Sequence, residues 1–206
     1  MQKPNIFLFT AFEGEVKPIL NLPTMISETT FNNIKVRTFD FDNRKINVLI
    51  TGMGKKKTKK ILSDVADFIE NGVIINIGTA GSLNNKLQIG DWFSINKVFS
   101  DDKVIETDNC NIFHTASILT SDSEITNEEI KQKHHKKYCA DLVDMESFHI
   151  AEFAKQKNMP CYAVKMVSDH ANEGTNTITA LKNTMKIHYN PHAAENFVKV
   201  IKAALI

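Results

Sequence analysis

Two acidic segments of this chain have the residue types and positions that acid/base chemistry requires. An apolar run, Cys161–Val167, leads directly into Ser168 and Asp169, so it places a carboxyl group at the end of a predicted strand. Strand ends of this kind lie at the mouth of an α/β sheet, where ligands bind. Asp144, Met145 and Glu146 open a predicted helix, whose dipole and free N–H groups favour an ionised carboxylate. One proton donor and one anionic acceptor predict a divided acid/base site, although an isolated carboxylate in either place is more often only a cap.

Convergence with other strand ends strengthens that prediction. Four short apolar strands each run into small, polar or acidic residues, and these pairs are Glu13 and Glu15, Gly52 and Gly54, Thr79 and Gly81, and Ser168 and Asp169. Glycine at such positions permits positive φ and a close approach of ligand to backbone N–H groups. The pattern predicts a site for a small polar molecule with two or three catalytic carboxylates, and therefore an enzyme.

The elements that must position these residues alternate between strands and helices. Strands are predicted at 6–10, 36–41, 45–50, 73–77, 92–99, 115–120 and 161–167, and helices at 55–70, 145–157 and from 190 onward. Residues 127–137 read as a charged helix or a loop, and 100–114 have no clear pattern. This alternation is typical of an α/β fold in which helices flank a mixed sheet. The chain of 206 residues contains no linker, so we expect one domain over residues 1–206.

Composition excludes several classes of function. The 25 basic and 24 acidic residues balance, which argues against a nucleic-acid partner, and the lysine cluster at 55–60 reads as a solvated helix face. The three cysteines, Cys110, Cys139 and Cys161, are widely spaced, as suits a reducing compartment. No apolar stretch reaches the ~18 residues that would span a membrane. We therefore expect a cytoplasmic protein that needs no metal and no cofactor.

Two local motifs are candidate sites of other chemistry. Gly52-Met-Gly54-Lys55 lacks the spacing of a Walker A loop or of a dinucleotide fingerprint, so it is either a tight turn into a helix or a loop that faces a sugar or anion. Cys161 lies inside a strand with no base beside it, which argues against thiol catalysis.

Four segments together resemble the nucleoside phosphorylase/nucleosidase superfamily. They are Ala11-Phe-Glu-Gly-Glu15-Val16, Gly78-Thr-Ala-Gly81 followed by Leu87-Gln-Ile-Gly90-Asp91, Val143-Asp-Met-Glu146 followed by Ile150-Ala151, and Val167-Ser-Asp169. Their order and spacing agree over nearly the whole chain, and the first is most similar to the methylthioadenosine/S-adenosylhomocysteine nucleosidases. The resemblance implies a mixed, partly barrel-like sheet, a nucleoside substrate and a homodimer.

The resemblance also implies a role for each matched residue. Asp169 corresponds to the general acid that protonates purine N7, and Ser168 would orient it. Glu15 corresponds to the base that activates water, with Glu13 as its nearest competitor. Glu146 corresponds to the acceptor for the ribose hydroxyls, and Met145 packs on the sugar. The transition state would resemble a ribosyl oxocarbenium ion that nearby carboxylates stabilise.

Four further positions bear on the water and on substrate choice. Thr79 and Lys165 match positions near the water and its carboxylate, and backbone groups around Ile125 match those that recognise adenine. Glu124 stands where the nucleosidases carry a base-stacking aromatic, and a carboxylate cannot stack in that way. Residues 99–117 also form a shorter segment than in those nucleosidases. The resemblance therefore does not determine which 5′-substituent the substrate carries.

Water rather than phosphate is the predicted nucleophile. Superfamily phosphorylases hold phosphate with arginines, and one of those positions is Asn76 here. The chain contains only Arg37 and Arg44, neither in a site motif, and the first turn carries Glu13 and Glu15, which would repel phosphate. The prediction is a purine nucleoside N-ribosyl hydrolase acting on 5′-methylthioadenosine or S-adenosylhomocysteine. The alternatives are a futalosine hydrolase, a phosphorylase, or a catalytically silent nucleoside-binding protein.

The predicted homodimer needs a contact surface. Phe99, Ile112 and Phe113 are apolar residues in an otherwise polar region, and we expect them to form a contact patch.

Overall fold

A single twisted sheet organises the chain. The computed structural model describes residues 4–20, 25–41, 43–172 and 191–203, and within them ten strands are joined in the order β10-β6-β8-β9-β5-β1-β4-β3-β2, with β7 beside β6. The strands are β1 (Asn5–Thr10), β2 (Met25–Phe31), β3 (Ile34–Phe41), β4 (Arg44–Ile50), β5 (Gly72–Ser82), β6 (Trp92–Ser100), β7 (Lys103–Glu106), β8 (His114–Thr120), β9 (Leu142–Asp144) and β10 (Cys161–Asp169).

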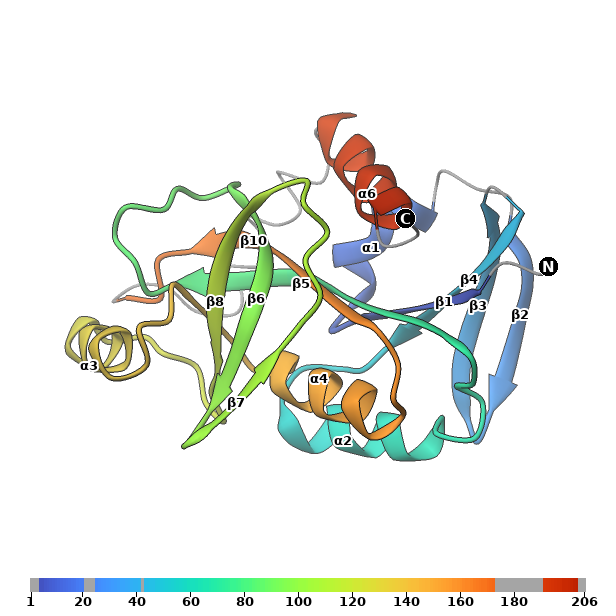
Figure 1. Cartoon of the computed structure of the whole chain (residues 1–206), viewed down its shortest axis with the longest axis horizontal. Helices are drawn as coiled ribbons and strands as arrows, with labels where there is room; N and C mark the ends of the chain where they lie inside the picture. Colours follow the sequence, from blue (N-terminus) through green and yellow to red (C-terminus); the bar gives the residue numbers. More distant parts are fainter. Residues whose placement is uncertain (1–3, 21–24, 42, 173–190, 204–206) are drawn as a thin grey trace.

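Half of this sheet closes on itself. β5 pairs with β10, β10 with β6, β6 with β8, β8 with β9, and β9 returns to the end of β5. The ring of five strands is a small barrel, while β1 to β4 extend from β5 as an open sheet (Figure 1). The mixed α/β fold and its partly barrel-like sheet are therefore confirmed.

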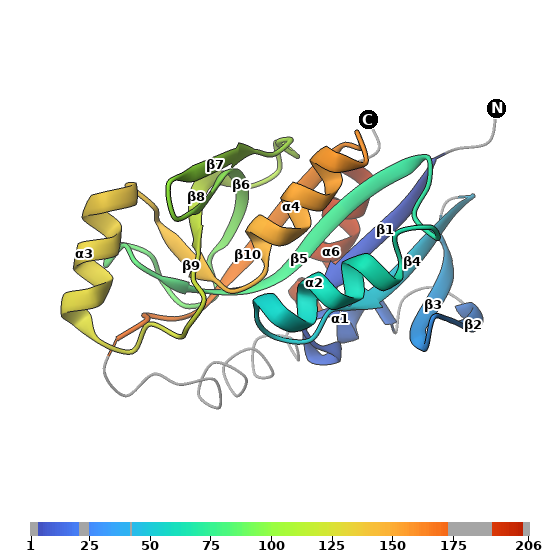
Figure 2. The same cartoon turned by 90° about the horizontal axis from the view of Figure 1, so that it is seen from below.

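Helices cover the two faces of the open sheet. α1 (Glu13–Leu20) and α6 (Pro191–Ala203) lie on one face, and α2 (Lys55–Asp64) and α4 (Ser147–Gln156) on the other (Figures 1 and 2). β1 shows why two apolar layers form, because Ile6 and Leu8 pack in one cluster and Phe7 and Phe9 in the other. This alternation with period two is what a strand buried on both faces requires.

α3 (Glu128–Tyr138) lies at the barrel end and settles the assignment of residues 127–137 as helix. The Asn127 side chain accepts hydrogen bonds from the backbone N–H groups of Glu129 and Ile130, so it caps the first turn. Acidic residues occupy the first turn and basic residues the last, as the helix dipole favours. Cys139 ends the helix in a left-handed conformation.

Several predicted boundaries were wrong. The 73–77 strand extends through the glycine segment to Ser82, because Gly78 to Gly81 still pair with β10. The helix expected from Met145 begins at Ser147, because β9 includes Asp144. The helix expected to reach Glu70 ends at Asp64, followed by turns.

Three strands were not predicted, namely β2, β7 and the three-residue β9. β2 is mostly exposed and polar, so it has no apolar alternation, and it forms by pairing with β3. β7 is a short hairpin partner of β6 within the unassigned region.

The expected contact patch is only partly available. Phe99 is half-buried and packs against Tyr138, and Phe113 stacks on Trp92 with ring centroids 5.7 Å apart. Ile112 is half-buried beside the second apolar cluster. These side chains are partly used by contacts within the chain, and their use in a contact between two copies stays a prediction. Among the described residues, every helix is too short or too polar to cross a bilayer.

His149 makes the stability of this fold sensitive to acid. Its ring is buried in α4, and neither ring nitrogen has a hydrogen-bond partner among the described residues. Burial lowers the pKa of His149, and the nearby ammonium groups of Lys59 and Lys55 lower it further. The unfolded chain therefore takes up this proton first as pH falls. The contribution of the neutral ring to the free energy of unfolding is fully present above about pH 6.5, the ordinary histidine pKa, and is lost as the pH decreases below that value.

We expect His149→Phe to remove this part of the acid sensitivity. The free energy of unfolding, measured by urea denaturation at several pH values, should lose a slope of up to about 1.4 kcal/mol per pH unit below about pH 6.5. His114 is exposed, so His114→Phe is the control and should keep the wild-type slope. An unchanged slope in His149→Phe would contradict this reading.

Candidate active site

The predicted site residues converge on one pocket with a volume of about 240 Å³. Its walls come from the turn after β1, the Met53 loop, the end of β5, the loop before α3, the turn between β9 and α4, and the end of β10. The predicted residues that line it are Glu15, Thr79, Ile125, Met145, Glu146, Ser168 and Asp169. Lys165 lies behind this wall, in the core.

Glu15 is a buried carboxylate held from two sides. Oε2 accepts hydrogen bonds from the Thr10 hydroxyl at 2.7 Å and from the Ala11 N–H at 3.0 Å. Oε1 accepts from the Thr79 N–H at 2.7 Å and from the Thr79 hydroxyl at 2.8 Å. These donors connect α1 to the ends of β1 and β5 and fix the orientation of the carboxylate.

Glu13 does not share this position. Its side chain is 57% exposed and forms an ion pair with Arg37 at 3.0 Å. The expectation that both carboxylates of the first turn would face the nucleophile was therefore wrong. The reason is helical geometry, because residues two apart point to different faces of α1.

Glu146 and Met145 occupy the turn between β9 and α4. The Gly54 N–H donates to Glu146 Oε1 at 2.6 Å, so the Gly52–Gly54 loop is a tight turn whose amide is taken by a protein carboxylate. Burial raises the pKa of Glu146 to about 7, and the Asp144 carboxylate adds to the increase while Lys165 opposes it. A carboxyl group that is partly protonated near neutral pH can both accept and donate hydrogen bonds to a diol.

Asp169 ends β10 at a register irregularity. Its Oδ2 accepts from the Ser168 hydroxyl at 2.7 Å, and its Oδ1 accepts from the Ala171 N–H at 2.8 Å. The predicted contact between Ser168 and Asp169 is present. Both carboxylate oxygens are anchored, and the half-buried side chain lines the pocket.

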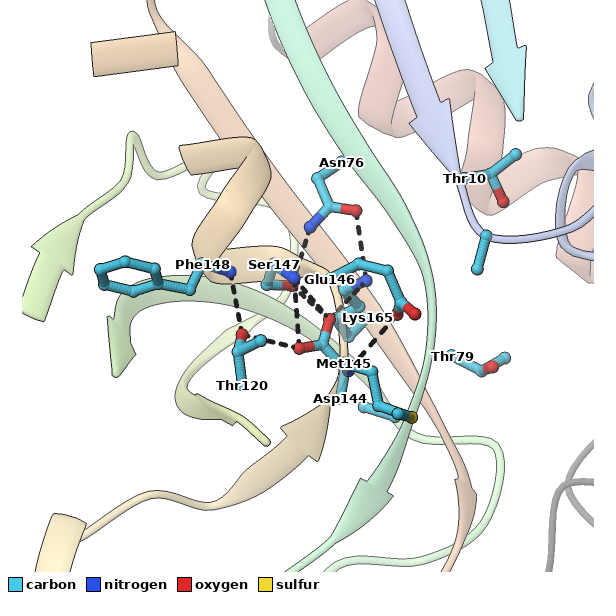
Figure 3. A network of polar contacts seen from close by, with 12 residues as sticks. Thr10, Asn76, Thr79, Thr120, Asp144, Met145, Glu146, Ser147, Phe148 and Lys165 are labelled. Atoms are coloured by element: carbon cyan, nitrogen blue, oxygen red, sulfur yellow. Dashed lines mark hydrogen bonds and ion pairs between the residues drawn. The ribbon is translucent and has the colours of Figure 1, made fainter. Parts of the chain in front are cut away.

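A buried ion pair lies beneath these three carboxylates. Lys165 Nζ is 3.0 Å from Asp144 Oδ2, and the two side chains are 3% and 2% exposed. Lys165 also donates to Asn76 Oδ1 at 3.2 Å, and Asn76 donates to the Ser147 hydroxyl at 2.7 Å. Figure 3 shows the Asp144 carboxylate at the centre of this network.

The remaining lone pairs of Asp144 are also satisfied. Its carboxylate accepts from the Thr120 hydroxyl at 2.9 Å and from the backbone N–H and hydroxyl of Ser147 (Figure 3). Thr120 in turn accepts from the Phe148 N–H at 2.9 Å. The Asp144 carboxylate therefore satisfies the first backbone N–H group of α4, and it also neutralises Lys165.

The loop from Ser123 to Thr126 forms the pocket wall before α3. Ile125 is buried there and Glu124 is exposed, and both line the pocket. Phe12 is a half-buried aromatic side chain in the turn after β1 and lines the pocket as well. An aromatic contact for a planar ligand is therefore available from Phe12.

The family model of the phosphorylase superfamily matches residues 5–116 and 108–206 of this sequence. These two matches together span almost the whole chain. The chain belongs to the phosphorylase superfamily.

Relatives within the superfamily include named nucleosidases. A 5′-methylthioadenosine/S-adenosylhomocysteine nucleosidase of Staphylococcus aureus is 26% identical over 203 residues, covering 81% of this chain and 87% of the relative. A Helicobacter pylori structure of that nucleosidase, a mutant with 5′-methylthioadenosine in the active site, aligns with a TM-score of 0.86 at 18% identity, covering 97% and 98% of the two chains. A futalosine hydrolase structure from Helicobacter pylori aligns with a TM-score of 0.84 at 19% identity, covering 97% of each chain.

Several polar residues of this superfamily member were not predicted as site residues. Thr10 holds Glu15, and Thr120 and Ser147 hold Asp144. The sequence indicates Asn76 only as the place of a missing arginine. Asn76 had a usable signal, because a polar residue inside an apolar strand requires a buried partner. Among the described residues there is no group of three or more His, Cys, Asp or Glu side chains arranged to hold a metal ion.

Gly78 gives a test of the Glu15 geometry. A Cβ atom at this position would lie 2.8 Å from Glu15 Oε1, and the carboxylate cannot move without breaking its hydrogen bonds. We expect Gly78→Ala to displace Glu15 and lower any turnover in this pocket by roughly 100-fold, since an error of about 1 Å in position costs that much.

The matched control is a double-mutant cycle measured by thermal unfolding. In a Glu15→Ala background the added methyl group meets no carboxylate, so Gly78→Ala should cost much less stability than in wild type. Equal losses of stability in both backgrounds would show that the added methyl group does not displace the Glu15 carboxylate.

Proposed function

We propose that this chain is a purine nucleoside N-ribosyl hydrolase that cleaves 5′-methylthioadenosine or S-adenosylhomocysteine to adenine and the thioribose. One observation carries the proposal: Glu15, Glu146 and Asp169 reach one pocket from three different elements. Because different residues hold each of these side chains, each side chain can perform a different step of the reaction. The nucleosidase names of the relatives agree with this assignment.

In the proposed mechanism Asp169 donates a proton to purine N7 while the bond between C1′ and N9 breaks. The bond electrons stay with the base, which leaves neutral. The sugar develops oxocarbenium character, which the Glu15 and Glu146 carboxylates stabilise. Water attacks C1′ and gives its proton to Glu15. Proton transfer through solvent returns Glu15 and Asp169 to their starting states.

The Glu15 environment suits a base that orients water. Thr10, Ala11 and Thr79 already donate to its oxygens, so the carboxylate is fixed before substrate arrives. Glu146 suits the ribose hydroxyls, because Gly54 occupies Oε1 and the residue lies beside Met145 on the same turn. Ser168 orients Asp169 for the base.

The charge of the pocket supports water over phosphate as the nucleophile. Among the described residues that line it are five carboxylates and no lysine or arginine. Asn76 is committed to Lys165 and Ser147, and Arg37 is paired with Glu13 and Glu28 away from the site. A phosphate dianion would meet repulsion rather than a cationic clamp.

A panel of nucleosides, each incubated with and without phosphate, tests the proposal. We expect free sugar and free base at a rate that phosphate does not change, with 5′-methylthioadenosine or S-adenosylhomocysteine turned over fastest. Faster turnover of futalosine would identify futalosine as the substrate instead. This alternative is specific, because the futalosine hydrolase structure has the same fold. Ribose 1-phosphate would overturn hydrolysis, and binding without turnover would identify a silent nucleoside-binding protein.

We further propose one domain over residues 1–206, a cytoplasmic location in methionine salvage, and a homodimer. The continuous sheet supports one domain, the three free cysteines suit a reducing compartment, and the resemblance to nucleosidases supports the dimer. Sedimentation at micromolar concentration should give twice the 23.2 kDa mass of the chain, and a 23.2 kDa species would contradict the dimer.

Asp169→Asn should fold normally and lose most turnover of purine nucleosides. An amide cannot donate the proton that the leaving base requires, and general acid catalysis supplies about 10²–10⁴-fold in rate. Steady-state rates and circular dichroism provide the measurement. Near-normal turnover in the folded variant would show that Asp169 is not the general acid.

Binding experiments should distinguish the roles of Glu15 and Glu146. We expect Glu15→Gln to abolish hydrolysis while nucleoside binding, measured by calorimetry, stays largely intact. Glu146→Gln should weaken both, because a lost hydrogen bond to a charged group costs roughly 1.5–3 kcal/mol. A 2′-deoxy substrate lacks one hydroxyl and should lose less from the Glu146 change. Loss of binding in Glu15→Gln, or an equal penalty on the deoxy substrate, would mean that the roles are misassigned.

A further inference from the structure

Lys131 is a buried cation that does not line the pocket. Its side chain, on α3, is 1% exposed, and burial lowers its pKa. Nζ donates a hydrogen bond to the backbone carbonyl of His170 at 2.7 Å, and the Glu128 carboxylate is 3.9 Å away. Burying an ammonium group is costly, so an apolar residue would suit a contact that served packing alone.

The acceptor of this hydrogen bond lies in the turn that carries Asp169. His170 stands between Asp169 and Ala171, and Ala171 has a φ of 47°, in the left-handed region that non-glycine residues rarely adopt. The turn is held by the bond from the Ala171 N–H to Asp169 Oδ1 and by the bond from Lys131 to the His170 carbonyl. An unfavourable backbone conformation is retained only where its surroundings fix it, and Lys131 supplies a fixed point from another element.

The other end of this link is a second part of the pocket wall. α3 begins after Asn127, directly after the Ser123–Thr126 loop. Ile125 of that loop and Ala171 belong to the same apolar cluster, and both line the pocket. Lys131 therefore couples the loop proposed to face the base to the turn proposed to protonate it.

We propose that Lys131 is a positioning residue that holds the Asp169–Ala171 turn so that the Asp169 carboxyl group meets the leaving base. This inference rests on the proposed hydrolase function and deepens it. The effect of Lys131 passes through Asp169, so it should appear only when the leaving group needs a proton. A residue that supported the fold alone would affect every substrate of the pocket equally.

The experiment compares two substrates of the same sugar with different leaving groups. Adenosine needs protonation of its base, whereas 4-nitrophenyl β-D-ribofuranoside releases a stable anion without it. We expect Lys131→Met to lower kcat on adenosine by roughly 10–100-fold and to leave kcat on the nitrophenyl riboside within about threefold. Lys131→Arg keeps a cation and should recover part of the loss. Lys133 is exposed on the same helix, so Lys133→Met is the matched control and should match wild type on both substrates.

A second cycle tests the route through Asp169. In an Asp169→Asn background Lys131→Met should produce no further loss on adenosine, because the group it positions is already gone. Lys131→Leu, which also lacks an N–H donor, replaces Lys131→Met if that variant does not fold, with the same expected selectivity. Equal losses on both substrates, or full additivity with Asp169→Asn, would overturn the inference alone. A wild-type protein that hydrolyses neither substrate nor any nucleoside of the panel would overturn the proposed function and the inference with it.

Discussion

The site depends on the buried ion pair between Lys165 and Asp144. Its two side chains come from β10 and β9, and their charged atoms are 3.0 Å apart in the core. Such a pair is tolerated only when its remaining hydrogen-bonding capacity is used, and Asn76, Ser147 and Thr120 use it. The pair therefore fixes how the turn with Met145 and Glu146 stands against the strand that ends at Asp169.

The same pair sets the charge balance of the pocket. Lys165 is attracted by Asp144, Glu15 and Glu146, and together they raise its pKa against the effect of burial. Without this cation three carboxylates would lie close together in a water-poor region, where like charges repel strongly. Glu146 still has its pKa raised to about 7, because burial and Asp144 outweigh Lys165 there. A pocket of this charge would meet the electrostatic demand of the proposed glycosidic cleavage, in which the sugar becomes positive.

Much of this arrangement could be predicted from the sequence, for identifiable reasons. The apolar strands 6–10 and 161–167 have strong composition signals, and the acidic residues at their ends pointed to Glu15 and Asp169. Local pattern could not tell Glu15 from Glu13, because both lie in one helical turn, and only packing places Arg37 against Glu13. Asp144 was expected in a helix with Glu146, yet it ends a strand and pairs with a lysine 21 positions later. Contacts between distant segments of this kind leave no periodicity in the sequence. The strand β2 was missed for another reason, because it is mostly exposed and polar.

The central claim is that water attacks C1′ of a ribosyl group held in this pocket. Hydrolysis in ¹⁸O-labelled water, followed by mass spectrometry of both products, tests it most directly. The account predicts one ¹⁸O atom at C1 of the released sugar and none in the purine, with the same outcome in phosphate buffer. Sugar released without the label, or as a phosphate ester, would contradict it.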